Sequence, residues 1–264
     1  DRSYEQYSAQ GGGYVQDYLR LGGFADANRW QTDGLGDERG TRIGAEARWH
    51  LYPQIWLEGQ LWQLQFDGDL DDLVGGDLRL HLPNRWLGGY AELRYGRQEI
   101  ETVEALRAEI SADVYELATY SRLFDKVDLF ANAQQIDRSD ENETWLVFGR
   151  AVYRFQEWPY LGAGYLFRFG DSDSDPDEYW APEELEQHQL YANWRGSWRT
   201  LGWSLSGQAG YSRELDVDWQ FIWGGNARLD WTLARRLTLR LEGIYQESAT
   251  YERTTVSASA LFRF

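Results

Sequence analysis

The chain ends on the stretch TTVSASALFRF, residues 254–264, in which apolar and polar side chains alternate. Val256, Ala258 and Ala260 fall on one face of an extended chain, whereas Thr255 and Ser257 fall on the other. A repeat of two residues is typical of a β-strand that has one apolar and one polar surface. This stretch therefore predicts a strand that separates two different environments.

The same alternation continues backwards through LTLRLEGIYQ, residues 237–246, and through most of the chain. It predicts strands long enough to cross a lipid bilayer at a tilt. The predicted strands are 13–24, 41–51, 54–66, 77–83, 85–97, 106–117, 126–136, 144–155, 160–170, 187–197, 201–213, 221–233, 237–248 and 252–264. They number about 14, with 16 as the alternative, and an even number is typical of bacterial outer-membrane barrels.

The composition favours a membrane barrel over a helical membrane protein. Mean hydropathy is −0.64, and no run approaches the ~20 apolar residues that a spanning helix needs. Aromatic residues make up 16% of the chain, with 14 Trp and 17 Tyr, and such rings form girdles at the two lipid–water boundaries of a barrel. Gly and Ala are frequent on the apolar face, and Arg is frequent on the polar face, which fits lipid outside and water inside.

We therefore predict an all-β fold, a transmembrane antiparallel up-and-down β-barrel over residues 13–264. Residues 1–12 are expected to be a periplasmic stub or a partial first strand.

The predicted connections between strands alternate between short and long. The short ones are 52–53, 83–84, 123–126, 156–159, 198–200 and 234–236. The others are 25–40, 67–76, 98–105, 137–143, 171–186 and 214–220, with a short one near 249–251. Short turns of such barrels face the periplasm and long loops face outside. The alternation predicts the outer membrane of a Gram-negative bacterium, with both termini on the periplasmic side.

The C-terminus carries a second signal. The chain ends on Leu261-Phe262-Arg263-Phe264, and outer-membrane barrels commonly end on an aromatic residue in this way. We predict that Phe262 and Phe264 form an assembly signal. The expected partners are the barrel assembly machinery, outer-membrane lipid and lipopolysaccharide.

Several classes of function are disfavoured. The net charge of −17 argues against nucleic acid as a partner, and the absence of cysteine excludes a disulfide scaffold or a thiolate metal site. The three histidines, His50, His81 and His188, lie on separate segments, and no catalytic Ser, His and Asp set can be assembled around them. We predict no enzymatic activity, no cofactor and no metal site.

Charged side chains recur on the polar side of the predicted strands. They can pair across neighbouring strands and stiffen the wall, or they can line a lumen for polar, sugar-like or charged solutes, and both roles stay open. The predicted lumen-lining residues are Arg48, Glu58, Glu92, Arg94, Glu109, Asp113, Asp128, Arg150, Arg168, Arg195, Arg228, Asp230, Arg240 and Glu242.

Most of the acidic residues lie in the long connections. Three interpretations stay open: solvated loop charge, contact with divalent cations of lipopolysaccharide, and attraction of a cationic solute. The predicted acidic extracellular mouth comprises Asp67, Asp69, Asp71, Asp72, Asp137, Asp140, Glu141, Asp171, Asp173, Asp175 and Asp177.

One stretch carries a resemblance to a known family. Tyr179-Trp180-Ala181-Pro182 precedes a predicted strand that contains Leu190-Tyr191-Ala192-Asn193-Trp194-Arg195, and a Gly-rich strand over 201–211 follows it. This arrangement resembles the C-terminal barrels of exopolysaccharide secretion proteins that carry a tetratricopeptide scaffold. The Pel, poly-N-acetylglucosamine and cellulose export systems have this layout.

The resemblance implies an outer-membrane channel that exports an exopolysaccharide. The polysaccharide chain and the periplasmic or lipoprotein components of a secretion complex would then be partners. The acidic mouth favours a partly cationic amino-sugar polymer of a biofilm. Tyr179, Trp180 and Tyr191 are the expected sugar contacts. The alternative is a stand-alone diffusion porin for small polar or charged solutes.

Overall fold

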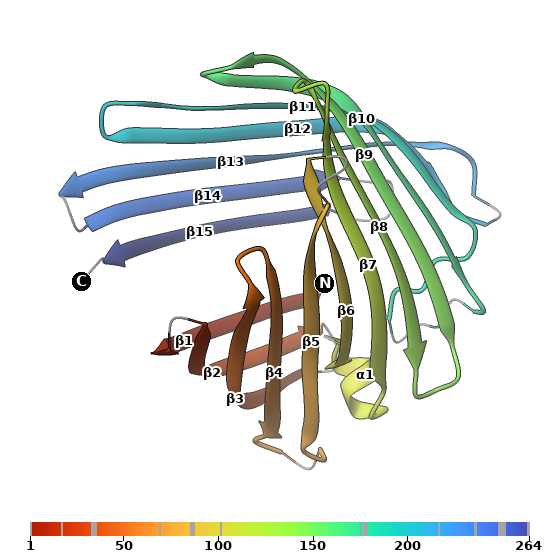
Figure 1. Ribbon diagram of the computed structural model, residues 1–264. Coiled ribbons are helices and arrows are strands. Elements are labelled where there is room, and N and C mark those ends of the chain that lie inside the picture. Colours follow the sequence, from red (N-terminus) through yellow and green to blue (C-terminus); the bar gives the residue numbers. More distant parts are fainter. Residues whose placement is uncertain are drawn as a thin grey trace. The chain divides into compact units, whose positions relative to one another are not determined.

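The computed structural model describes residues 2–16, 18–32, 36–68, 70–84, 88–100, 102–174, 176, 179–215, 217–234, 237–247 and 252–262. Within these residues it contains fifteen strands and one short helix (Figure 1). In chain order they are β1 (Arg2–Gln16), β2 (Leu19–Thr32), β3 (Gly36–Tyr52), β4 (Ile55–Phe66), β5 (Leu73–Asn84), β6 (Gly89–Glu99), α1 (Val103–Arg107), β7 (Ser111–Leu123), β8 (Val127–Arg138), β9 (Glu143–Glu157), β10 (Tyr160–Ser172), β11 (Leu185–Trp198), β12 (Leu201–Arg213), β13 (Gln220–Ala234), β14 (Leu237–Glu247) and β15 (Glu252–Phe262).

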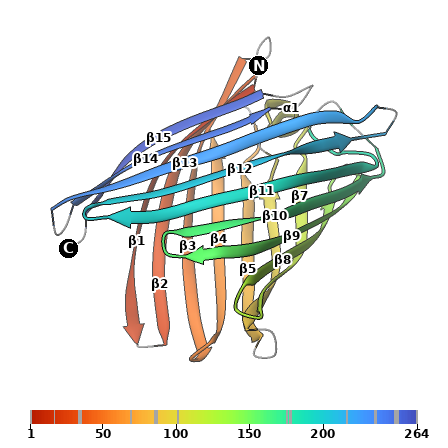
Figure 2. The same cartoon turned by 90° about the horizontal axis from the view of Figure 1, so that it is seen from above.

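The strands form one sheet in which each strand neighbours the next along the chain, from β1 to β15. Every pair with a described register is antiparallel. Figure 2 shows β1 to β5 following one another in this order. The predicted all-β antiparallel meander is confirmed, whereas closure of β15 onto β1 stays a prediction. No helix among the described residues is long and apolar enough to cross a membrane.

The chain divides into two compact units. Unit 1 comprises Asp1–Thr119, Asn132–Leu146 and Gly170–Glu183. Unit 2 comprises Tyr120–Ala131, Val147–Phe169 and Glu184–Phe264. The division cuts across strands β7 to β10, so each unit contains one end of these strands.

The N-terminal strand is the first difference from the prediction. Residues Arg2–Gln16 form a full strand, whereas the sequence predicted a stub or partial strand and then a strand over 13–24. Three consecutive glycines at 11–13 have no side chains, so the sequence shows no alternation of apolar and polar residues there. Arg2 pairs with Thr32. Arg2 therefore lies at the end of the sheet that carries the long connections. We predicted both termini at the opposite end, where the tight turns lie.

The predicted loop 25–40 is wrong for most of its length, because β2 continues to Thr32 and β3 begins at Gly36. The many charged residues of this stretch are typical of a solvated loop. In the structure they pair between the two strands, and Arg29 Nε donates to Asp37 Oδ2 over 3.0 Å. Cross-strand ion pairs of this kind replace the missing apolar alternation.

The predicted strand 106–117 is wrong at its start, because Val103–Arg107 form helix α1. Thr102 caps the helix, since its Oγ1 accepts a hydrogen bond from the Ala105 N–H over 3.2 Å. Glu109 has a left-handed φ of 56°, and β7 begins only at Ser111. The alternation of β7 is therefore opposite to the predicted one.

The predicted loop 137–143 is a tight hairpin. β8 continues to Arg138 and β9 begins at Glu143. The Arg138 N–H donates to the Asn142 carbonyl over 3.1 Å, and Glu141 takes a left-handed φ of 70° at the turn. The other predicted strands coincide with observed ones to within a few residues, and β12 coincides with 201–213.

Side chains alternate between two faces of the sheet. The face that we call the apolar face carries Leu61, Val74, Leu190 and Val256, each with 68–72% of its surface exposed. The opposite face, which we call the polar face, carries the arginine–carboxylate pairs described in the next subsection. Exposed aliphatic side chains in such numbers are unfavourable in water and favourable in lipid. The two faces therefore suit two different solvents.

A charge on the apolar face should destabilise the protein in a bilayer. We predict that Leu205→Arg, near the middle of β12, costs about 2–4 kcal/mol of unfolding free energy in phospholipid. The matched control is Ser206→Arg, one residue along on the polar face, which should cost much less. Heat-modifiable mobility and denaturant titration in lipid vesicles measure the effect. Equal losses at positions 205 and 206 would contradict the assignment of faces.

Candidate functional site

Ion pairs connect neighbouring strands on the polar face of unit 1. Arg94 on β6 donates to Asp77 on β5, and its Nη1 lies 3.4 Å from Glu116 Oε2 on β7. Glu116 also accepts a hydrogen bond from Asn132 on β8. Charge-assisted hydrogen bonds thus run across four consecutive strands, and each bond polarises the next.

A second charged set lies toward the long connections of unit 1. Arg42 Nε donates to Asp26 Oδ2 over 3.0 Å, and its Nη1 donates to Glu99 Oε1 over 3.2 Å. The guanidinium also lies 5.6 Å from the centre of the Trp62 ring. Asp26 and Glu99 are buried, and a buried carboxylate without a partner destabilises the folded state. The Arg42 guanidinium supplies the positive charge that both carboxylates need. The sequence did not predict this set, because residues 25–40 were interpreted as a loop.

The predicted residues Arg48, Glu58, Glu92 and Arg94 all lie on this polar face. Arg48 donates to Glu58 across β3 and β4. Glu92 Oε1 lies 3.0 Å from Nδ1 of His81. Their role as lumen-lining residues stays a prediction, and their observed contacts are cross-strand pairs.

Two predicted lumen residues lie elsewhere. Glu109 is outside the strands, in the turn that follows α1. Asp113 lies on the apolar face, where its Oδ1 accepts a hydrogen bond from the Tyr95 hydroxyl over 3.2 Å. The reason is the reversed alternation of β7, which gives the polar face Glu116 in place of Asp113.

Asp128 is the centre of a polar cluster in unit 2. Its Oδ1 accepts from the Tyr120 hydroxyl over 2.7 Å and from Arg122 Nε over 3.1 Å. Its Oδ2 lies 3.3 Å from Arg154 Nε and 3.3 Å from the Tyr160 hydroxyl. The cluster joins β7, β8, β9 and β10 near their tight-turn ends.

A smaller cluster in unit 2 involves four predicted residues. Asp230 accepts from Arg228 Nε over 2.9 Å and from Arg240 Nε over 2.7 Å. Glu242 lies opposite Arg228 in the register of β13 and β14. The Asp230–Arg240 pair joins β13 to β14, whereas Arg228 and Asp230 lie on the same strand.

The remaining predicted arginines of unit 2 lie beside aromatic rings. Each guanidinium carbon is within the ~6 Å range of a cation–π contact. The pairs, measured to the ring centres, are Arg150 with Tyr191 at 5.1 Å, Arg168 with Phe148 at 6.0 Å and Arg195 with Tyr160 at 4.4 Å.

Part of the polar face of unit 1 is covered by helix α1 and by residues of the connections between strands. We call residues 102–110 and 179–182 the cover. Val103 and Leu106 of α1 pack with Trp30, Trp62 and Leu64, and all five side chains are buried. The sequence did not predict the cover, since apolar residues within a charged loop carry no periodicity.

The two segments of the cover also pack against each other. Ala105 and Ile110 share a buried cluster with Tyr179 and Ala181. Outside the cluster, Arg107 Nε donates to Glu38 Oε1 over 2.7 Å. The cover is therefore held by apolar packing at its centre and by an ion pair at its edge.

Tyr179 is an anchor rather than an exposed sugar contact. Only 4% of its surface is exposed. Its hydroxyl donates to Asp140 Oδ2 over 2.5 Å and accepts from Asn142 Nδ2 over 3.0 Å. Burial, and then the hydrogen bond to the Asp140 carboxylate, raises the pKa of Tyr179 to about 12, so the phenol stays protonated at neutral pH. The predicted sugar contact at Tyr179 is therefore wrong for this conformation, whereas Trp180 is half exposed and Tyr191 lies on the polar face of unit 2.

The predicted acidic residues that the structure describes lie at one end of the strands of unit 1. Asp67, Asp71 and Asp72 follow β4 and are exposed. Asp140 and Glu141 lie in the hairpin after β8, although Asp140 is engaged by Tyr179. The others are Asp137 within β8, Asp171 within β10 and Asp173 after β10. Asp69, Asp175 and Asp177 lie outside the described residues. Of the predicted assembly signal, Phe264 also lies outside them, and the side chain of Phe262 is not described.

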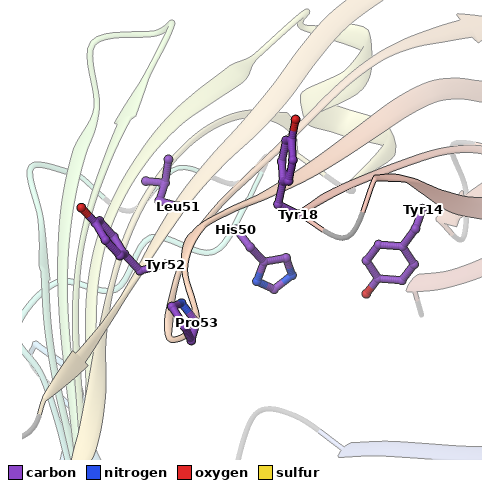
Figure 3. Close-up of a pocket in the computed structure, with 6 residues that line it drawn as sticks. All are labelled: Tyr14, Tyr18, His50, Leu51, Tyr52 and Pro53. Carbon is purple, nitrogen blue, oxygen red and sulfur yellow. The ribbon is translucent and has the colours of Figure 1, made fainter.

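An aromatic pocket lies at the opposite, tight-turn end of unit 1. It has a volume of about 670 Å³ and is open to solvent. Figure 3 shows Tyr14, Tyr18 and Tyr52 around His50 and Pro53. The His50 N–H donates to the Tyr18 carbonyl over 2.8 Å, which ties two neighbouring turns together. Exposed tyrosines at strand ends are typical of the aromatic belt at a lipid–water boundary.

Comparison with solved structures finds similar folds, whereas no family model and no curated protein matches the sequence. The structure described as a bacterial polysaccharide outer membrane secretin matches with a TM-score of 0.79 and 16% identity, covering 99% of this chain and 91% of that one. The chain has the fold of this outer-membrane β-barrel. The siderophore receptor PirA from Pseudomonas aeruginosa is a weaker match, with a TM-score of 0.38, 12% identity, and coverage of 100% of this chain and 70% of that one.

The cover should loosen when its apolar centre is reduced. We predict that Leu106→Ala, which removes side-chain contacts with Trp30, Trp62 and Leu64, costs about 2–5 kcal/mol of local stability. Amide hydrogen exchange over residues 102–110 and tryptic cleavage after Arg107 should become faster. The control is Leu117→Ala on the apolar face of β7, which should leave both rates unchanged. Equal exchange rates in Leu106→Ala and the wild type would contradict the described packing.

Proposed function

We propose that this chain is an outer-membrane channel that exports an exopolysaccharide. The observation that carries the proposal is the similarity of the whole chain to the barrel of a polysaccharide secretin. The two faces of the sheet support it, because an apolar outer surface and a charged inner surface suit a wall between lipid and a hydrated path. In this proposal the polar face lines the path.

Aromatic side chains on the polar face support a sugar ligand. Trp56 and His81 stack with ring centres 4.7 Å apart and planes 5° apart, and Tyr90 lies 4.9 Å from His81. Arg48 lies 4.8 Å from the centre of the Trp56 ring. A row of rings flanked by charge offers apolar surface to the C–H face of a sugar and hydrogen bonds to its hydroxyls. Small ions need no such row.

The acidic end of unit 1 favours a cationic polymer. Asp67, Asp71, Asp72 and Asp173 are exposed there. Exposed carboxylates that share one end create a field that attracts cations over about a Debye length, ~8 Å at physiological salt. The proposed polymer is therefore a partly deacetylated amino-sugar chain, which carries ammonium groups. Trp180, a half-exposed residue of the cover, adds a ring that such a chain can contact.

The channel is placed in the outer membrane of a Gram-negative bacterium, with lipopolysaccharide and the barrel assembly machinery as partners. Periplasmic or lipoprotein components would deliver the polymer to it.

Deletion of the gene distinguishes export from diffusion. We predict loss of the polysaccharide from the cell surface and its accumulation in the periplasm, with uptake of small solutes unchanged. Immunoblotting of fractionated polymer and radiolabelled solute uptake measure the two effects. Normal surface polymer together with slower solute uptake would favour the diffusion porin instead.

Neutralising the acidic end tests the polymer class. We predict that replacing Asp67, Asp71, Asp72 and Asp173 with Asn lowers cation selectivity in single-channel recordings and reduces export several-fold, because the attractive field is lost. The control replaces Asp125 and Glu157, at the tight-turn end, with their amides and should change export less. Unchanged selectivity and unchanged export would reject a role for these carboxylates.

A further inference from the structure

A groove lies on the polar face of unit 2, close to the tight turns of β7 to β11. Its volume is about 180 Å³. Tyr160 and Tyr191 form part of its wall, and Arg150, Arg195 and Asn193 also line it. The groove thus combines aromatic surface with hydrogen-bond donors, which is the composition of a small-ligand site.

The charges of this groove are not balanced. Arg122 shares the Asp128 carboxylate with Arg154. Among the residues that the structure describes, no carboxylate lies within ion-pair distance of Arg150 or Arg195. Three arginines and one aspartate line the groove, which leaves it with net positive charge.

The two uncompensated guanidiniums are held in place by rings. Arg195 lies 4.4 Å from the centre of Tyr160, and Arg150 lies 5.1 Å from the centre of Tyr191. A guanidinium that lies over a ring keeps its N–H groups in its own plane, where they can bind an anion. Arg195 is exposed and Arg150 is partly exposed, so both are accessible to a ligand.

We infer that this groove binds a carboxylate of an acidic sugar unit. A carboxylate pairs with a guanidinium fork through two hydrogen bonds, and Tyr160 and Tyr191 offer apolar surface to the sugar ring. An ammonium group is disfavoured here by the net positive charge. The inference rests on the proposed function only in that the ligand is a glycan. A polymer that binds at this groove and is also attracted by the acidic end of unit 1 carries carboxylates as well as ammonium groups.

Binding of short oligosaccharides to the full chain in detergent micelles tests this inference. The probes are a trimer of galacturonic acid, a neutral trimer of N-acetylglucosamine and a cationic trimer of glucosamine, compared by calorimetry at low salt. We expect the acidic trimer to bind tightest and the cationic one weakest. The double variant Arg150→Gln with Arg195→Gln should weaken binding of the acidic trimer roughly ten-fold or more, as expected for lost charge-assisted hydrogen bonds.

The matched control is Arg213→Gln, which removes an arginine of the same unit that pairs with Glu186 outside the groove. It should bind the acidic trimer like the wild type. If the double variant does not fold, as judged by heat-modifiable mobility, Arg195→Lys serves instead, since it keeps the charge and loses the fork, and should weaken binding.

Two outcomes would overturn the inference: an acidic trimer that binds no tighter than the neutral one, or binding that the groove substitutions leave unchanged. The assay does not depend on secretion. Normal export without this binding would therefore contradict the groove alone, and binding without export would contradict the proposed channel alone.

Discussion

Every backbone N–H and C=O in a membrane-spanning segment needs a partner, because hydrocarbon offers none. A strand cannot satisfy these groups within itself, so each strand of this chain depends on the strands paired with it. The meander meets the requirement with the nearest segment of chain each time, and the register of β13 and β14 pairs Trp231 with Leu239 and Asp230 with Arg240. Once this pairing is set, the alternation of side chains decides which residue meets which solvent, and a slip of one residue would exchange the two faces.

The constraint explains which parts of the fold the sequence could predict. β12 and β14 have an apolar residue at almost every second position, and their bounds were predicted almost to the residue. β1 was missed because three consecutive glycines show no alternation. The outer halves of β2 and β3 were missed because their side chains are mostly charged and pair with one another across the two strands. The backbones of these strands pair like those of the others, but their side chains lack the alternation that would predict a strand.

The candidate site was less predictable than the fold, for a different reason. Arg94 and Glu58 could be placed on the polar face by alternation alone. Glu116 could not, because Ala112, Val114 and Ala118 share its face and give that face an apolar pattern. Tyr179 is buried through contacts with Asp140 and Asn142, residues almost forty positions away in the sequence. No local pattern specifies contacts over such a separation.

The contact of each strand with the next one in sequence also has an evolutionary consequence. Duplicating or deleting one hairpin adds or removes two strands without changing the register of any other pair. The width of such a sheet can therefore change by gene-level duplication while the existing polar rows are kept. Channels of different diameter, suited to polymers of different thickness, are then separated by few genetic steps.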